Sequence, residues 1–432
     1  MVDLSPFRAI RYAGEDVAPL LAPPYDVIDA AEQDRLYARH PHNIVRIDLN
    51  RAEDADHPLA RYERAAGFLS EWLAQGVLLR DPTPAIYVLA QTFTGPDGVD
   101  RTRTGFFARV RLCRFDEGWI LPHERTLRGP KADRLHLFRA TKTNLSPIFG
   151  AYRDPGGEVR GLLHAASARA PLYEATLGAV KNRLYRLDAE GALQRMSELF
   201  APKKIYIADG HHRYETGLAY RDERRAAQGG RIDPDAGFEH ILMFSAAVED
   251  PGMVIFPTHR LLHGLPTIDL AQFLGSLSRF FSVEAAPAEA GAARLALERA
   301  GRDASALLMV TPRGHYLLRA IEGAPWHEIA ALPSTEALRH LDVTRLHAVI
   351  LETLLGVSPE AQATQANLRY SKDFAEAFAA PEHDPGVQMA FLMNPTKIDE
   401  VISVAESGQV MPQKSTFFYP KIPSGLVLYP LD

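Results

Sequence analysis

One short stretch of the chain carries the residue types that phosphate chemistry requires. An apolar run, Ile205-Tyr206-Ile207-Ala208, is followed directly by Asp209-Gly210-His211-His212-Arg213. A strand that turns at glycine into a helix directs free backbone N–H groups and the positive end of the helix dipole toward one point. Glycine also lets the backbone approach a ligand closely. The stretch therefore predicts a phosphate-binding turn that includes Gly210.

The side chains of this turn have distinct expected roles. Arg213 can hold phosphate oxygens through two parallel hydrogen bonds, and His211 and His212 add further donors. Asp209 is placed where it can hold a magnesium ion or orient a hydroxyl group. The alternative is a helix N-terminus capped by Asp209, with the histidines in structural hydrogen bonds. Two histidines and an arginine in one turn favour the phosphate interpretation.

A second segment combines one carboxylate with many cations. Pro122-His123-Glu124-Arg125-Thr126 is followed by a run of basic residues: Arg128, Lys131, Arg134, Arg139 and Lys142. Phosphoryl transfer to an alcohol needs cations that stabilise the transferring group and a carboxylate that accepts the hydroxyl proton. Glu124 fits the carboxylate role. A solvated charged face is the usual meaning of such a run, and the segment by itself favours that alternative.

A third segment, from Gly408 to Thr416, superficially resembles a phosphate-binding P-loop. The second glycine before Lys414 is missing and the spacing is one residue too long, so it is not a Walker motif. Lys414 with the hydroxyls of Ser415 and Thr416 can still bind an anion such as a carboxylate or a phosphate. A plain surface loop remains the open alternative.

Other motifs are less informative about chemistry. Pro23-Pro24-Tyr25-Asp26-Val27 predicts a rigid turn with a structural role. His259 and His263 have the spacing of a zinc pair, but no glutamate follows the first histidine as it does in metalloproteases. The sequence has no Gly-x-Ser-x-Gly elbow, and no Gly-x-Gly-x-x-Gly follows a strand, so neither a lipase nor a dehydrogenase is supported.

Periodicity predicts the elements that position these segments. We expect strands over 85–94, 102–112, 203–208, 240–247, 253–257 and 387–393, and a hairpin over 305–321. We expect helices over 55–75, 214–227, 268–280, 288–299, 344–355 and 397–406, and a loop with a short helix over 121–147. This mixed α/β pattern restarts after Gly237. It predicts a phosphate-binding domain over 1–238 and a second α/β domain over 239–432 that contributes the Lys414 loop.

Composition limits the classes of function. The chain has 432 residues, of which 46% are hydrophobic and 24% charged, as in globular proteins. Its formal net charge of -6 disfavours a general nucleic-acid binder. Cys113 is the only cysteine, and no long uninterrupted apolar run is present. We therefore expect a cytoplasmic protein that binds a small molecule and neither nucleic acid nor membrane; its oligomeric state is not predicted.

Over nearly its full length the chain resembles a widespread prokaryotic family catalogued as a domain of unknown function. Three segments carry this resemblance: Pro23–Ile28, Ala208–Thr216, and Met411–Thr416 together with Tyr419-Pro420-Lys421. Three motifs, in the same order, also resemble those of the archaeal free serine kinase, a ParB/sulfiredoxin-like enzyme. They are Pro122-His123-Glu124, Asp209-Gly210-His211-His212-Arg213, and the stretch from Gly408 to Thr416. Together they cover a small part of the chain.

The kinase resemblance implies a fold, a reaction and residue roles. It implies a ParB/sulfiredoxin-like core and transfer of a phosphoryl group from ATP, ADP or pyrophosphate to a small alcohol, with L-serine giving O-phosphoserine. Glu124 would be the catalytic base, and Asp209 would assist hydroxyl activation or bind Mg²⁺. The segment from His211 to Arg213 would hold phosphates, and the segment from Lys414 to Thr416 would bind the amino acid. The kinase has arginine where this chain has Phe417.

Two further functional hypotheses use the same residues. A nucleotide-dependent switch related to the ParB partition proteins would bind nucleotide at Asp209–Arg213 without needing an acceptor. A phosphohydrolase would replace the acceptor alcohol with water. Dependence of turnover on an acceptor separates the kinase from both alternatives.

Overall fold

The computed structural model describes residues 1–54, 56–95, 97–124, 128–230 and 232–431. The chain divides into two compact units. The first unit comprises Met1–Pro122, Thr126–Val254 and Phe418–Asp432, and the second comprises His123–Arg125 and Ile255–Phe417. The sequence placed its boundary between residues 238 and 239. The functional division proposed with that boundary stays a prediction.

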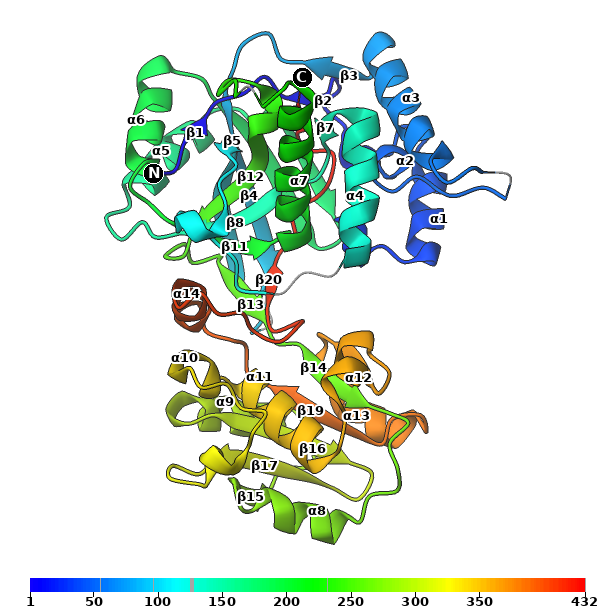
Figure 1. Cartoon of the computed structure of the whole chain (residues 1–432), viewed down its shortest axis with the longest axis vertical. Coiled ribbons are helices and arrows are strands. Elements are labelled where there is room, and N and C mark those ends of the chain that lie inside the picture. The colour runs from blue at the N-terminus through cyan, green and yellow to red at the C-terminus, as the bar shows by residue number, and fades with distance from the viewer. Residues whose placement is uncertain (55, 96, 125–127, 231, 432) are drawn as a thin grey trace. The chain divides into compact units, whose positions relative to one another are not determined.

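A nine-stranded mixed sheet forms the centre of the first unit (Figure 1). Its strand order is β6-β11-β8-β12-β5-β4-β10-β9, and β1 pairs with β5. The strands are β1 (Leu4–Ser5), β4 (Ile86–Thr94), β5 (Asp100–Arg111), β6 (Ile120–Leu121), β8 (Ile148–Tyr152), β9 (Tyr173–Leu177), β10 (Val180–Leu187), β11 (Ile205–Asp209) and β12 (His240–Ala247). β11 runs parallel to β6, β12 runs parallel to β8, and the other pairs are antiparallel. The strands predicted over 85–94 and 102–112 are β4 and β5, and they pair antiparallel.

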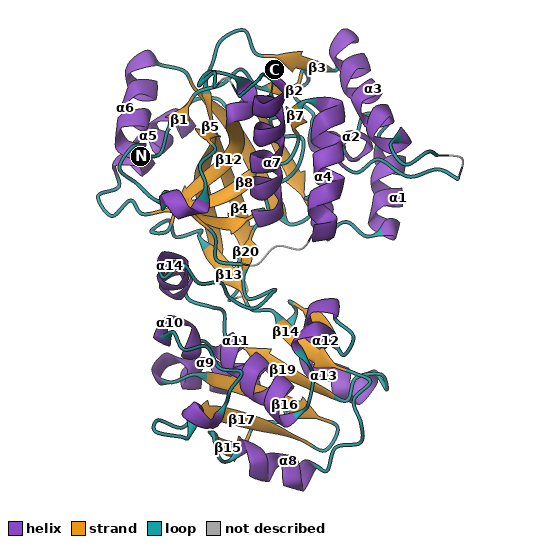
Figure 2. Cartoon of the chain, in the orientation of Figure 1, coloured by secondary structure: helices purple, strands orange, loops and turns teal. Residues whose placement is uncertain are grey.

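The helices of this unit are α1 (Ala30–Arg39), α2 (Val45–Asp48), α3 (Ala60–Ala74), α4 (Arg128–Thr141), α5 (Glu158–Ser167), α6 (Glu190–Phe200) and α7 (His211–Ala227). α5, α6 and α7 contact the sheet, α4 packs on α7, and α3 packs on α4 (Figure 2). Apolar side chains of α5 and α6, including Leu163 and Phe200, join the buried cluster with strand residues such as Phe106 and Ile205. Short strands complete the unit: β2 (Ile10–Tyr12) pairs with β3 (Leu78–Arg80), and β7 (Thr143–Asn144) pairs with β21 (Tyr429–Pro430).

The strand, turn and helix around Gly210 form as the sequence predicts. The first four residues of β11 are buried, so this strand is a hydrophobic run inside the sheet. The helix that follows begins at His211, three residues earlier than expected. The region 121–147 also differs from its prediction, because α4 is a full helix of 14 residues. The many charged residues of this segment obscured its helical periodicity in the sequence. α4 packs between α3 and α7.

The second unit has a six-stranded antiparallel sheet in the order β15-β17-β16-β19-β14-β18. Its strands are β14 (His259–Leu262), β15 (Phe281–Ala285), β16 (Ala306–Thr311), β17 (Gly314–Ala320), β18 (Leu368–Ser371) and β19 (Met389–Met393). Its helices are α8 (Leu270–Leu277), α9 (Ala290–Asp303), α10 (Glu336–Arg339), α11 (Asp342–Arg345), α12 (Pro359–Thr364), α13 (Phe374–His383) and α14 (Ile398–Glu406). β13 (Val254–Phe256) and β20 (Phe417–Tyr419) form a separate two-stranded sheet. The expected mixed α/β class is confirmed.

The predicted helix over 344–355 has an unusual form. α11 continues directly into a π-helix, Leu346–Leu354, in which the N–H of Leu355 bonds the carbonyl of Ile350. Hydrophobic periodicity indicates a helix but does not distinguish i to i+4 from i to i+5 hydrogen bonding. π-helical turns are rare and occur frequently near functional sites.

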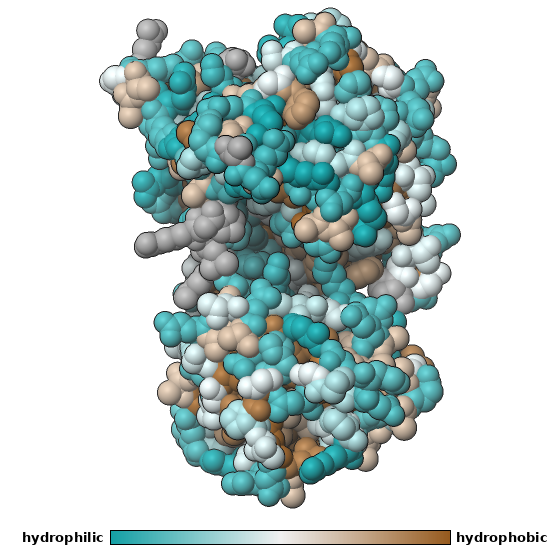
Figure 3. Space-filling view, turned by 90° about the vertical axis from the view of Figure 1, so that its right-hand side faces the viewer, coloured by the Kyte–Doolittle hydropathy of each residue, from teal (hydrophilic) through white to brown (hydrophobic). Residues whose placement is uncertain are grey.

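The surface drawn in Figure 3 is mostly hydrophilic, with hydrophobic residues in small scattered groups. Across the part of the chain that the structure describes, no helix is both long enough and apolar enough to cross a membrane.

Candidate functional site

The turn between β11 and α7 requires glycine. Gly210 has φ 90°, in the left-handed region, and a Cβ atom there would lie 3.0 Å from the guanidinium carbon of Arg213. An L-residue would therefore be both strained and crowded. Gly210 is the N-cap of α7, no side chain caps the helix, and its first turn has no acidic residue. The part of the alternative in which Asp209 caps the helix is wrong, because the Asp209 carboxylate is held elsewhere.

Asp209 forms two ion pairs at the end of β11. Its Oδ1 atom accepts a hydrogen bond from Lys421 Nζ at 2.8 Å, and its Oδ2 atom accepts one from Arg213 Nη2 at 2.6 Å. Burial favours the neutral carboxyl, but Lys421 and Arg213 together outweigh burial and hold the pKa of Asp209 well below its ordinary value. Asp209 is therefore a fixed carboxylate between two cations.

Arg213 makes contacts inside the protein that the sequence did not indicate. Its side chain is buried, and Nη1 donates to the carbonyl of Pro147 while Nη2 donates to Asp209. Both ends of the guanidinium fork are thus used inside the protein. In this arrangement Arg213 shapes the turn, and the assignment of His211 and His212 to phosphate stays a prediction. His211 is buried, and His212 is partly exposed.

Lys421 is the site residue that sequence reasoning missed. It follows Tyr419-Pro420, and the buried guanidinium of Arg103 donates to the carbonyls of both residues. The amide of Gln91 donates to the carbonyl of Lys421 at 3.3 Å. These contacts hold the C-terminal segment against β4 and β5, and so bring the Lys421 ammonium to Asp209.

Arg103 can hold that segment because the sheet encloses it completely. Its guanidinium lies over the ring of Phe149, 4.6 Å from the ring centroid. Burial lowers the pKa of Arg103 to about 9, and the charge of Asp250 opposes this shift. A guanidinium in such surroundings needs fixed acceptors, and the carbonyls of the C-terminal segment supply them.

The Pro23–Val27 turn lies beside this cluster, and its structural role stays a prediction. Its short 3-10 helix, Tyr25–Val27, places the Tyr25 ring 3.9 Å from the guanidinium carbon of Arg134. Arg134 donates to Asp48 Oδ1 at 3.1 Å. Burial raises the pKa of Tyr25, while Arg213 and Arg134 oppose the rise.

The basic run after Glu124 is largely used in ion pairs. Lys131 pairs with Glu215 on α7, Arg139 pairs with Glu223 on the same helix, and Arg134 pairs with Asp48. Arg125, Thr126 and the side chain of Arg128 lie outside the described residues. The described cations therefore join α4 to its neighbours. These ion pairs favour the interpretation of the run as a charged face over its interpretation as a catalytic cluster.

The second unit brings Glu124 and the Lys414 loop together. The backbone N–H of Lys414 donates to Glu124 Oε1 at 3.3 Å, and the N–H of Met411 donates to the carbonyl of His123 at 2.8 Å. His123 Nε2 lies 2.9 Å from Thr416 Oγ1. Two segments separated by almost 300 positions in the sequence thus form one local structure.

Hydrogen bonds fix the shape of this loop. Lys414 has φ 57°, and its carbonyl accepts from Nη2 of the fully buried Arg260 at 3.2 Å. The Ser415 hydroxyl donates to the carbonyl of Pro412, so it is used inside the loop. Thr396 donates to the carbonyl of Ser415 at 2.9 Å. Arg260, which the sequence did not single out, therefore holds the loop through the Lys414 carbonyl.

The predicted site residues therefore fall into two groups. Asp209, Gly210 and the segment from His211 to Arg213 form a cluster in the first unit, completed by Lys421. Glu124 and the segment from Lys414 to Thr416 form a cluster in the second unit, completed by Arg260.

Magnesium at Asp209 stays a prediction. Both carboxylate oxygens of Asp209 already accept hydrogen bonds from cations, so a magnesium ion there would share these oxygens with Lys421 and Arg213. Among the residues that the structure describes, no group of three or more histidine, cysteine or acidic side chains is placed to hold a metal ion.

Comparison with solved structures finds chains of low similarity. A conserved hypothetical protein from Pyrococcus furiosus is 14% identical, with 75% of this chain and 95% of that chain covered and a TM-score of 0.35. A free serine kinase in complex with AMP is 14% identical, with coverage of 74% and 92% and a TM-score of 0.35. C-terminally truncated SbnI from Staphylococcus aureus is 11% identical, with coverage of 75% and 87% and a TM-score of 0.33. Because these TM-scores are low, no residue role is assigned to this chain from these structures.

Comparison with curated protein sequences finds no match. The model of one family, described as "Protein of unknown function (DUF1015)", matches residues 4–344. That span is most of the chain and includes the turn at Gly210 and Glu124. The chain belongs to the DUF1015 family.

Proposed function

We propose that this protein is a phosphotransferase that moves a phosphoryl group from a nucleotide or pyrophosphate to a small hydroxylated metabolite. The specific form of the proposal is a free serine kinase with a ParB/sulfiredoxin-like core, which makes O-phosphoserine from L-serine. ATP, ADP and pyrophosphate are candidate donors because all three present similar phosphates.

The observation that carries the proposal is the start of α7. Gly210 ends a buried strand in a left-handed turn, and a helix of 17 residues begins at the next position. The N-terminal end of such a helix attracts phosphate through its backbone N–H groups and its dipole. His211 and His212 occupy the first turn. The Asp209 carboxylate does not compete with phosphate there, since Lys421 and Arg213 neutralise it.

The acceptor chemistry is assigned to Glu124. In the proposed step the hydroxyl oxygen of the acceptor attacks the terminal phosphorus, and the bond from that phosphorus to the leaving phosphate oxygen breaks. The hydroxyl proton passes to the Glu124 carboxylate. A hydrogen bond from the Lys414 N–H at 3.3 Å orients that carboxylate.

Binding of a serine carboxylate needs a cation, and Phe417 stands where the kinase has arginine. Lys372 Nζ lies 3.4 Å from the centroid of the Phe417 ring. An ammonium group is therefore present beside Phe417, held by a cation–π contact. We assign the carboxylate of the acceptor amino acid to Lys372.

Phosphorus NMR of the purified full chain tests the proposal. ATP, ADP or pyrophosphate would be incubated with L-serine, each with and without magnesium. A new O-phosphoserine resonance that depends on serine supports the kinase. Release of inorganic phosphate without serine would replace it with a phosphohydrolase, and nucleotide binding without turnover would replace it with a ParB-like switch.

A further inference from the structure

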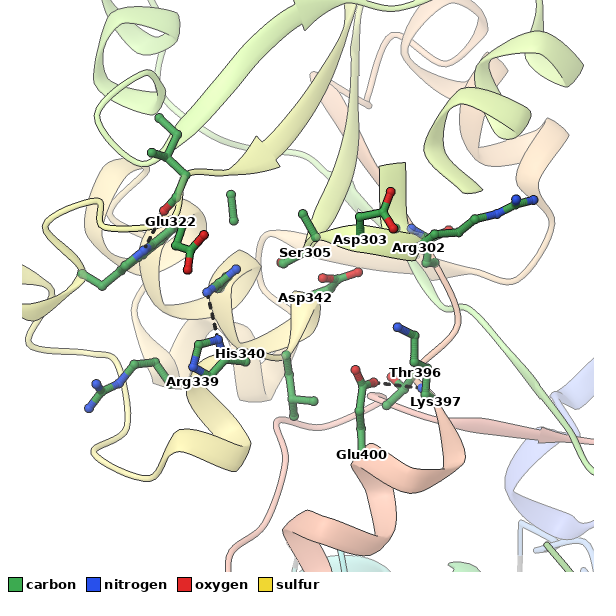
Figure 4. Close-up of a pocket in the computed structure, with 18 of the residues that line it drawn as sticks. Arg302, Asp303, Ser305, Glu322, Arg339, His340, Asp342, Thr396, Lys397 and Glu400 are labelled. Carbon is green, nitrogen blue, oxygen red and sulfur yellow. Dashed lines mark hydrogen bonds between the residues drawn. The ribbon is translucent and has the colours of Figure 1, made fainter. Parts of the chain in front are cut away.

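A pocket of about 700 Å³ lies within the second unit, apart from Glu124 and the Lys414 loop. Figure 4 shows it between the ends of α9 and β17 and the starts of α11 and α14. Its size is within the range of pockets that bind small molecules. Polar and charged side chains make up much of its wall, so its ligand should be charged.

The charged side chains of this pocket do not pair with one another. Four cations and four acids line it: Arg302, Arg339, Arg345, Lys397, Asp303, Glu322, Asp342 and Glu400. Within the described ranges, none of the eight has an opposite charge within the 4.0 Å of an ion pair. Opposite charges kept apart around a cavity indicate a ligand that carries both signs.

Arg345 is the buried cation of the pocket. It is 7% exposed, and its guanidinium carbon lies 4.6 Å from the centroid of the Trp326 ring. Nη2 lies 3.3 Å from His340 Nδ1, and the buried Nε atom has no hydrogen-bond partner. A buried guanidinium without a carboxylate is costly. An anionic ligand group in the pocket would satisfy it.

Asp342 supplies the opposite charge. It lies three positions before Arg345 in α11, a spacing at which acidic and basic side chains ordinarily meet. Here Arg345 instead turns to Trp326. In Figure 4 Asp342 points into the pocket beside Ser305, with Glu400 on the facing helix. Burial raises the pKa of Asp342 to about 6; Ser305 and Arg345 oppose the rise, and Glu400 adds to it. An ammonium group would stabilise the carboxylate.

We propose that this pocket binds a small zwitterion, an α-amino acid or a short peptide, with its carboxylate on Arg345 and its ammonium group on Asp342 and Glu400. The site is independent of the proposed phosphotransfer, because it uses none of the residues assigned to donor or acceptor. Thr396 lines the pocket and also bonds the Ser415 carbonyl. Pocket and loop thus share one anchoring residue.

The experiment is calorimetric titration of the full chain with each of the common amino acids and with glycylglycine. For the best binder, the N-acetylated and C-amidated analogues are titrated as well. Each analogue keeps one charge only. Loss of a charged hydrogen bond in such a site predicts a reduction in affinity of about tenfold or more for both analogues.

Variants locate the binding. Arg345→Met and Asp342→Asn should each abolish or weaken binding at least as much as the matching analogue does. Arg299→Gln and Glu284→Gln remove exposed charges outside the pocket and should bind as the unmodified protein does. Melting temperatures of all variants report folding. If Arg345→Met does not fold, the analogue titrations and Asp342→Asn still test whether the zwitterion binds in this pocket.

Glu124→Gln separates this site from the acceptor site. Binding that persists in Glu124→Gln and disappears in Asp342→Asn supports the pocket. The proposal fails if no amino acid or glycylglycine binds, if the analogues bind as well as the zwitterion, or if binding disappears only in Glu124→Gln. The last result would assign the zwitterion to the acceptor site.

Discussion

The cluster at Asp209 and the cluster at Glu124 are built in opposite ways. The first is contiguous in sequence, and one remote residue, Lys421, completes it through side-chain ion pairs. The second joins two segments that are far apart, and mostly backbone groups hold it: the Lys414 N–H bonds Glu124, and the Met411 N–H bonds the His123 carbonyl. The first presents a helix N-terminus suited to an anion. The second presents a carboxylate suited to a proton.

This comparison predicts that chemistry and binding can be lost separately. Glu124→Gln should have the largest effect, a loss of phosphoryl transfer of about 100-fold or more, because general base catalysis contributes that much. The affinity for nucleotide should remain nearly unchanged, since the amide keeps the hydrogen bond from Lys414. Single-turnover transfer and nucleotide titration measure the two quantities. Equal losses of transfer and binding would assign Glu124 to structure instead.

A change at Asp209 should act through its two cations. Asp209→Asn leaves Lys421 and Arg213 without their counter-charge. We therefore expect the free energy of unfolding to fall by about 2 kcal/mol and the affinity for the phosphoryl donor to fall as well. Lys421→Met should have a similar cost. The double variant should cost less than the sum of the two, by about 1 kcal/mol or more. Additive costs in urea unfolding would mean that the pair contributes no coupling.

The sequence predicts the first cluster better than the second for a physical reason. A strand, a glycine and a helix are local features, so β11, Gly210 and α7 follow from pattern and propensity. The pairing of Asp209 with Lys421 depends on how Arg103 and Gln91 hold the C-terminal segment, which no local pattern encodes. The Tyr419-Pro420-Lys421 motif was a signal, but nothing in it identified the partner.

The same limit explains the errors. The segment 121–147 was expected to be a loop with a short helix because it has many cations and few strand-forming residues, yet α4 is a full helix and its cations pair with α7 and with Asp48. The contact between Arg213 and the Pro147 carbonyl was also not foreseen, because that carbonyl lies in a distant loop. The charges of a segment are readable from sequence, whereas their partners come from tertiary structure. Buried arginines such as Arg103 and Arg260 were missed for this reason.

Gly210→Ala tests whether backbone geometry carries the phosphate site. At φ 90° an alanine is strained and its Cβ approaches the Arg213 guanidinium, so we expect a loss of about 1–2 kcal/mol in the free energy of unfolding. Nucleotide affinity should fall with it, while the hydrogen bond between Lys414 and Glu124 is untouched. Gly229→Ala is the matched control, because Gly229 also has a positive φ, 68°, but has open space around its Cβ position. Equal nucleotide binding in both variants would contradict a phosphate site at Gly210.

Acid titration separates the clusters by charge. The pKa of Asp209 is lowered in the folded protein, so its contribution to stability is present above its unfolded pKa of about 4 and is lost as pH falls toward the folded value. Lys421→Met raises the folded pKa and should shift acid unfolding to higher pH. In the Asp209→Asn background the same substitution should cause no such shift. A shift that is equal in both backgrounds would remove Asp209 as its cause.

Lys372→Met should have the smallest effect, and it sharpens the identity of the acceptor. If Lys372 binds the carboxylate of serine, its loss raises KM for L-serine several-fold, in line with about 1 kcal/mol for an exposed charge contact. The value of kcat and the affinity for the donor should stay near those of the unmodified protein. An acceptor alcohol without a carboxylate should show no change in KM. A KM for L-serine that does not move would mean that the ammonium beside Phe417 only packs against the ring, and the acceptor would then be sought among alcohols that carry no carboxylate.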